Sequence, residues 1–150
     1  MRRRITLTTA AALGTTLAAT VALAPPADAV LRTQTVGMNC WSISPNIVDL
    51  PFNNGVSVRT DTNRPGLFSL WSYSKAVFPS TVDTTITVTS LTTNRSETFH
   101  RRWQPSLADL SGYQIDDLRG RGPIRITIRS VGHGLIPALP APICSGTATV

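Results

Sequence analysis

The sequence has 150 residues, of which 14 are Lys or Arg and 8 are Asp or Glu, so its formal net charge is +6. A chain of this length fits one domain preceded by a short leader. The positive charge favours binding to anionic polymers or surfaces in general. The basic residues match no nucleic-acid-binding motif, so we expect no nucleic-acid partner.

Residues 1–29 have the three parts of a secretory signal peptide. Arg2–Arg4 supply the positive start, Ile5–Ala24 form an apolar stretch, and Ala27–Ala29 offer small residues where signal peptidase cuts. Cleavage after Ala29 removes three arginines and one aspartate, and leaves residues 30–150 as a secreted, extracellular domain with a net charge of +4. A retained membrane anchor is the less favoured alternative, because threonines weaken the apolar stretch. The mature chain has no second long apolar run, so we expect no membrane span after the signal is removed.

Two cysteines remain, Cys40 near the mature start and Cys144 near its end. In an oxidising compartment, such a pair predicts a disulfide that closes nearly the whole domain. The alternative is a reactive or metal-binding thiol pair, which would need closer spacing or added histidine ligands.

Most of the mature chain predicts short β-strands separated by Gly, Pro and Asn turns. The clearest strand begins at Thr81, where Val82, Ile86 and Val88 alternate with threonines, and a second segment ending at Trp103 completes a hairpin. The other expected strands lie around residues 36–40, 56–59, 67–78, 113–115, 124–129 and 143–150, and residues 116–123 are expected to form turns. Many short strands and hardly any helix predict an all-β fold, a small antiparallel β-sandwich or related barrel.

One short segment adds a resemblance to this fold class. Residues 107–113, LADLSGY, resemble the approach to the tyrosine corner of immunoglobulin-like domains. The resemblance covers seven residues, and the cysteine pair here is terminal rather than at the family's spacing. It implies an immunoglobulin-like sandwich and no particular function.

The strand expected over residues 67–78 is apolar on both sides. Trp71, Tyr73 and Lys75 alternate onto one face, where the aromatic rings could stack on sugars or pack against a partner. Core packing of Trp71 and Tyr73 is the preferred interpretation, because a strand apolar on both sides is usually central or covered.

Arginines form the second candidate surface. Arg125 and Arg129 alternate with the isoleucines of their strand, while Arg101 and Arg102 project from the hairpin. If these strands are neighbours, the arginines predict a basic face for anionic polysaccharide or other envelope polymers. The preferred alternative is that they keep the wet face of a sheet soluble and prevent edge pairing.

The sequence offers little support for catalysis. Its two histidines, His100 and His133, lie in no local frame that holds a nucleophile, and no GxSxG, HExxH or phosphate-binding loop occurs. We therefore expect no catalytic residues, no metal site and no cofactor.

These observations predict a non-catalytic secreted module that binds a cell-wall polymer or a protein partner. The alternative is a serine-protease inhibitor that presents Leu135–Ile143, a loop stiffened by three prolines beside Cys144. A small hydrolase that uses His100 or His133 is the third and least favoured possibility.

Overall fold

The computed structural model describes residues 30–38, 40–46, 48–107, 111–136 and 143–150. The expected signal peptide therefore lies outside the described residues. Within these ranges the chain forms strands and no helix, as the sequence predicts. The strands are β1 Leu31–Val36, β2 Trp41–Ser42, β3 Phe52–Asn53, β4 Val56–Asp61, β5 Leu67–Tyr73, β6 Thr81–Ser90, β7 Ser96–Trp103, β8 Gly112–Arg119, β9 Pro123–His133 and β10 Ile143–Thr149.

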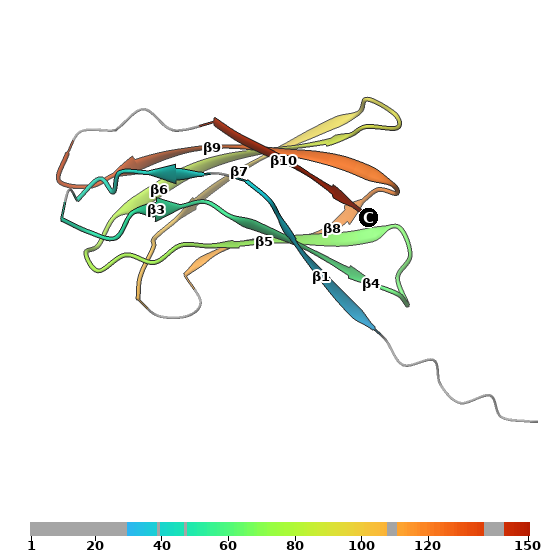
Figure 1. The fold of residues 1–150 in the computed structure, drawn as a ribbon, viewed down its shortest axis with the longest axis horizontal. Helices are drawn as coiled ribbons and strands as arrows, with labels where there is room; N and C mark the ends of the chain where they lie inside the picture. The colour runs from blue at the N-terminus through green and yellow to red at the C-terminus, as the bar shows by residue number, and fades with distance from the viewer. Residues whose placement is uncertain (1–29, 39, 47, 108–110, 137–142) are drawn as a thin grey trace, which may run out of the picture.

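Eight of these strands form two four-stranded antiparallel sheets that lie one over the other (Figure 1). One sheet has the order β1-β4-β5-β8 and the other the order β10-β9-β6-β7, while β2 and β3 make a separate short ladder. The chain crosses between the layers from β5 to β6, from β7 to β8 and from β8 to β9. We call the two layers the β5 sheet and the β6 sheet.

The inner faces of both sheets supply one core. The alternation expected after Thr81 is confirmed, because β6 buries every second side chain, and its Ile86 pairs in register with Ile128 of β9. Period-two alternation places one face of each strand against the other layer, so burial of apolar area stabilises the pair of sheets. The most completely buried apolar side chains are Leu70, Ile86, Ile124, Ile126, Ile128, Val56, Val58 and Val82.

The predicted disulfide between Cys40 and Cys144 is confirmed, and it encloses a separation of 104 residues. The sequence placed Cys40 inside the first strand, but β1 ends at Val36, and Cys40 lies buried in the segment before β2. The bond therefore joins the chain beyond β1 to β10 in the other layer.

A chain of buried, hydrogen-bonded polar side chains crosses the core. The Trp103 indole Nε1–H donates to Thr84 Oγ1 at 3.0 Å, and Thr84 Oγ1 lies 2.9 Å from Ser130 Oγ. Asn54, which lies between β3 and β4, donates from Nδ2 to Ser130 Oγ. These hydrogen bonds link β7, β6 and β9 to Asn54, which lies just before β4 of the β5 sheet.

The turn expected at Asp116 and Asp117 is wrong, because both residues belong to β8. On β5 one residue separates Phe68 from Leu70, whereas on β8 two residues separate their partners Leu118 and Ile115. The extra residue is a β-bulge, and Asp117 adopts a positive φ of 57° there. The bulge keeps both partners buried although they are three residues apart.

Candidate functional site

The β5 sheet exposes the aromatic residues that the sequence singled out. Core packing of Trp71 and Tyr73 is wrong for both: Tyr73 is 50% exposed and Trp71 is half-buried. The physical reason is the register of β5, which turns Phe68, Leu70 and Ser72 inward and leaves the alternate positions on the outer face. In a two-layer fold, that outer face meets solvent whatever residues it carries.

Arg59 and the two aromatic rings form a preassembled stack. The ring centroids of Trp71 and Tyr73 are 5.2 Å apart with the planes tilted by 33°. The guanidinium carbon of Arg59, from the neighbouring strand β4, lies 4.5 Å from the centroid of the Trp71 ring. A cation at this distance is attracted by the electron-rich face of an indole and holds the ring in place.

Hydrogen-bonding groups flank this stack on β8. Gln114 pairs in register with Trp71, and its Nε2 donates to Asp116 Oδ1 at 2.7 Å. Hydrogen bonds from Gln114 and Ser69 hold the pKa of Asp116 below its ordinary value, with a smaller contribution from nearby arginines. Asp116 is therefore a charged acceptor near neutral pH. We call Arg59, Trp71, Tyr73, Gln114 and Asp116 the Trp71 surface.

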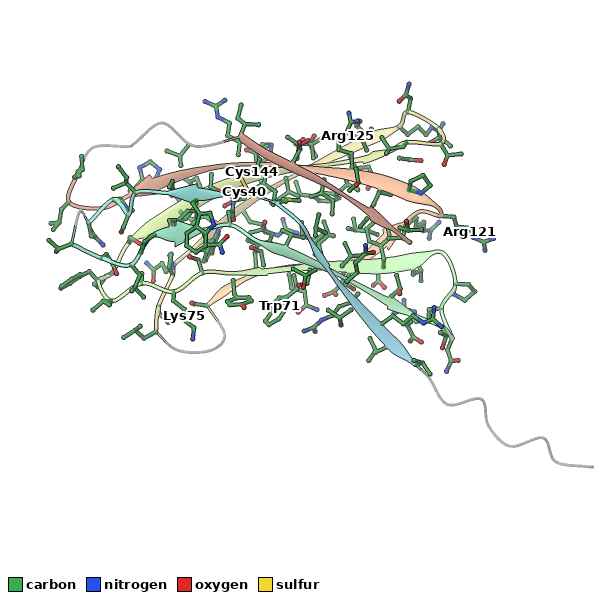
Figure 2. The ribbon with its side chains drawn as sticks, in the orientation of Figure 1. Cys40, Trp71, Lys75, Arg121, Arg125 and Cys144 are labelled. Carbon is green, nitrogen blue, oxygen red and sulfur yellow. A yellow bond between two sulfur atoms is a disulfide. The ribbon has the colours of Figure 1, made fainter. Side chains whose placement is uncertain are left out.

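The residues expected to form one binding face lie on different sides of the molecule. Figure 2 shows Trp71 and Lys75 on one side of the two layers and Arg125 on the other. Arg125 and Arg129 are exposed on the outer face of the β6 sheet. Arg101 pairs with the inward-facing Thr84, so it projects from the opposite side of the edge strand β7. The strand β6 lies between β7 and β9 in this sheet, and the register separates Arg101 from Arg125 and Arg129.

The outer face of the β6 sheet is rich in hydroxyl groups around Arg125 and Arg129. Two pairs of hydroxyl groups are hydrogen-bonded between β6 and β7, Thr87 with Thr98 at 3.1 Å and Thr89 with Ser96 at 2.8 Å. Within the described ranges neither arginine takes part in an ion pair. This face can therefore present two cations and several hydroxyls to an extended ligand.

A polar cluster that the sequence did not reveal surrounds Asp83 on the same face. Arg102 donates to both carboxylate oxygens of Asp83, at 2.7 and 2.9 Å, and His133 Nε2 lies 3.1 Å from Oδ2. The Arg102 guanidinium is the main cause of the lowered pKa of Asp83. Knowing that Asp83 and Arg102 are opposite each other in the hairpin would have predicted this pair.

The Asp83 cluster bears on the hydrolase hypothesis, because a histidine and a carboxylate lie within bonding distance. The cleft beside them, of about 470 Å³, is lined by Thr81, Arg102, Trp103, Gln104 and His133. A nucleophilic triad requires a hydroxyl bonded to the second ring nitrogen. Among the residues that the structure describes, none has a hydroxyl bonded to His133, and the carboxylate is shared with Arg102. The geometry therefore provides two members of a triad and not the third.

Comparison with known proteins gives no assignment. No family model matches the chain, and neither a curated protein nor a solved structure is similar to it at a significant level. In the described part of the chain, no group of three or more His, Cys, Asp or Glu residues could hold a metal ion. The same ranges contain no helix with the length and hydrophobicity to span a bilayer.

Proposed function

We propose that this chain is a secreted, non-catalytic binding module and that the Trp71 surface is its carbohydrate-binding face. The observation that supports this most directly is the outward position of Trp71 and Tyr73 on the middle of an exposed sheet. Neutral sugars present apolar C–H faces and a rim of hydroxyls. Aromatic rings with polar groups at their edges match both features, since the rings bury the apolar face and the polar groups bond the rim.

Preorganisation by Arg59 favours binding at this surface. The two rings contact each other, and the guanidinium lies over Trp71, before any ligand arrives, so little side-chain entropy remains to be lost on binding. Gln114 and Asp116 lie beside Trp71 with donor and acceptor groups facing solvent. A ligand that covers the rings would reach these groups.

Binding of the purified protein to insoluble cell-wall polysaccharides tests the proposal. Trp71→Ala and Tyr73→Ala should each weaken retention at least tenfold, about 1.4 kcal/mol, as expected for a stacking anchor. Trp41→Ala is the matched control, because Trp41 is also exposed but lies on β2. Retention that survives both substitutions on β5, or that is lost only with Trp41, would contradict the assignment.

An anionic polymer would instead favour the outer face of the β6 sheet. Its ligand would contact Arg125 and Arg129, which lie on the other layer from the aromatic stack. Arg125→Gln with Arg129→Gln should then abolish a salt-sensitive retention that Trp71→Ala leaves intact. The two versions of the module are thus distinguished by which pair of substitutions removes binding.

Protease inhibition is the second candidate function. Leu135 and Ile143, at the two ends of the proposed inhibitory loop, are both strongly exposed, whereas residues 137–142 between them lie outside the described residues. Incubation with several serine proteases, followed by mapping of any cut within the loop, tests this function. Rapid cleavage without inhibition would reject it.

The proposed function includes export and a fold assignment. A signal peptide at residues 1–29 would deliver the chain to an oxidising compartment, and the Cys40–Cys144 disulfide is compatible with that location. We assign the two-layer fold to the immunoglobulin-like sandwiches as a working hypothesis. N-terminal sequencing of the extracellular protein tests the export step, and a start at Val30 is the expected result.

A further inference from the structure

The two ends of the molecule differ in chemistry. Antiparallel strands bring the β4–β5, β6–β7 and β8–β9 turns to one end and the β2–β3, β5–β6, β7–β8 and β9–β10 connections to the other (Figure 1). The first end carries Arg64, Arg95 and Arg121 in its turns. At the second end, the described loop residues include one carboxylate, Asp49, and one lysine, Lys75.

Exposed apolar side chains are concentrated at this second end. Leu135 is 85% exposed, Val48 is 78% exposed and Ile43 is 72% exposed. Soluble domains rarely gather so many large apolar side chains in one region unless the region contacts something. We call the following six residues, which come from three connections, the apolar end: Ile43, Val48, Leu50, Val77, Phe78 and Leu135.

Hydrogen bonds tie these three connections together. Asn46, which is buried, donates to the carbonyl oxygens of Phe78 and Pro79 at 3.3 Å and accepts from the N–H of Leu135 at 3.2 Å. The Asp49 carboxylate accepts from the N–H groups of Val77 and Phe78 at 2.7 and 3.1 Å. The backbone beneath the apolar side chains is therefore braced, and their exposure is a feature of the fold.

The charged side chains near the apolar end are of both signs, and the cations are in slight excess. The Asp49 carboxylate is engaged by backbone donors, and Asp83, at the nearby end of β6, is held by Arg102. Arg101 lies close to the end of β7. Among the described residues, neither Arg101 nor Lys75 takes part in an ion pair. Apolar side chains next to cations that form no ion pair are the combination that binds an anionic lipid surface, since the apolar side chains enter the acyl boundary and the cations contact the headgroups.

We propose that the apolar end docks on bilayers that contain anionic phospholipid, with Val48, Leu135 and Ile43 entering the interface. A second copy of the chain fits less well. A two-fold interface through this end would bring the Lys75 and Arg101 side chains of both copies into one interface, where their like charges repel. A fluid bilayer also accepts side chains that project from separate loops without needing a complementary shape. This docking is independent of the Trp71 surface, which lies on the side of the β5 sheet.

Cosedimentation with vesicles of phosphatidylglycerol and phosphatidylcholine, compared with phosphatidylcholine alone, tests the proposal. The wild-type protein should bind the mixed vesicles, and Val48→Asp with Leu135→Asp should weaken partitioning on the order of a hundredfold. Leu91→Asp, in the β6–β7 turn at the opposite end, is the matched control and should leave partitioning unchanged. Lys75→Gln and Arg101→Gln should each weaken it roughly fivefold.

Tryptophan fluorescence gives a second readout, because Trp41 is exposed beside the β2–β3 connection and Trp103 is buried in the core. Vesicles that contain dibrominated lipid should quench the emission of Trp41. The Trp41→Phe variant should bind the vesicles as well as the wild-type protein but show no such quenching. The proposal is overturned if the wild-type protein does not cosediment with the mixed vesicles, or if the variant with Val48→Asp and Leu135→Asp binds them as tightly as the wild-type protein does. A wild-type dimer that this variant dissociates, without vesicle binding, would assign the apolar end to a second copy instead.

Discussion

Replacing Thr84 with valine removes one hydroxyl from the core and leaves the shape of the side chain almost unchanged. In the native protein this hydroxyl accepts the Trp103 indole N–H and contacts the Ser130 hydroxyl. The valine variant would keep the indole N–H buried without an acceptor, which costs about 1–3 kcal/mol. Ser130 still accepts from Asn54, so its loss is smaller. The added methyl group offsets part of the cost, and we expect the free energy of unfolding to fall by about 2 kcal/mol.

Urea denaturation, followed by tryptophan fluorescence and far-ultraviolet circular dichroism, measures this change. Thr85→Val is the matched control because Thr85 is the next residue of β6 but faces outward, where its hydroxyl contacts His100. The control should change the free energy of unfolding by less than about 0.5 kcal/mol. If Thr84→Val were as stable as this control, the buried polar chain would make no net contribution to stability, and the reasoning would be refuted.

Three further changes address stability. Replacing Cys40 and Cys144 with serine should lower the free energy of unfolding by about 4–5 kcal/mol in the chain-entropy model, because the bond encloses 104 residues; a loss below about 1 kcal/mol would contradict that model here. Burial raises the pKa of Tyr113 to about 12. The stabilisation that accompanies this raised pKa is complete below about pH 10 and is lost as the pH rises through about 12. The free energy of unfolding of Tyr113→Phe should therefore fall less between these pH values than that of the wild-type protein. If both proteins lose the same free energy of unfolding, Tyr113 is not the cause. Gly112→Ala should destabilise the β5–β8 pair by about 1–3 kcal/mol, because the new Cβ would lie 1.9 Å from the Ser72 carbonyl oxygen; Gly37→Ala, with nothing within 4 Å, is the control, and equal stability of the two variants would contradict the crowding.

Period-two alternation was sufficient to predict the inner faces of β6 and β9. Strand β6 carries its Val and Ile residues on only one of its two faces, and β9 carries its Ile residues on only one, so only one register buries them. The same rule failed for β5, where both faces are apolar and the pattern cannot say which one the other layer covers. Phe68 and Leu70 occupy the inner face, and Trp71 remains outside because a two-layer fold has no third layer to cover it.

The β8 strand could not be predicted because its alternation is interrupted. Ile115 and Leu118 are three residues apart, a spacing typical of a turn or helix rather than of a strand. The bulge at Asp116 and Asp117 restores both side chains to the core, but its position depends on the pairing with β5. The separation of Arg101 from Arg125 has the same origin, since it depends on which residue of β7 lies opposite Thr84.

The apolar end could be recognised only when the connectivity of the strands was known. Nothing in the sequence connects Ile43, Val48 and Leu135, because Leu135 comes 92 positions after Ile43 and 87 after Val48. Successive antiparallel strands reverse direction, so the β5–β6 and β9–β10 connections share an end, and Figure 1 shows the β2–β3 connection at that same end. A polymer on the side of the β5 sheet and a lipid surface at the apolar end would then not compete for the same residues. Trp71→Ala should consequently spare vesicle binding, and Val48→Asp with Leu135→Asp should spare polysaccharide binding; if either change removed both activities in a folded protein, the two surfaces would have to be a single site.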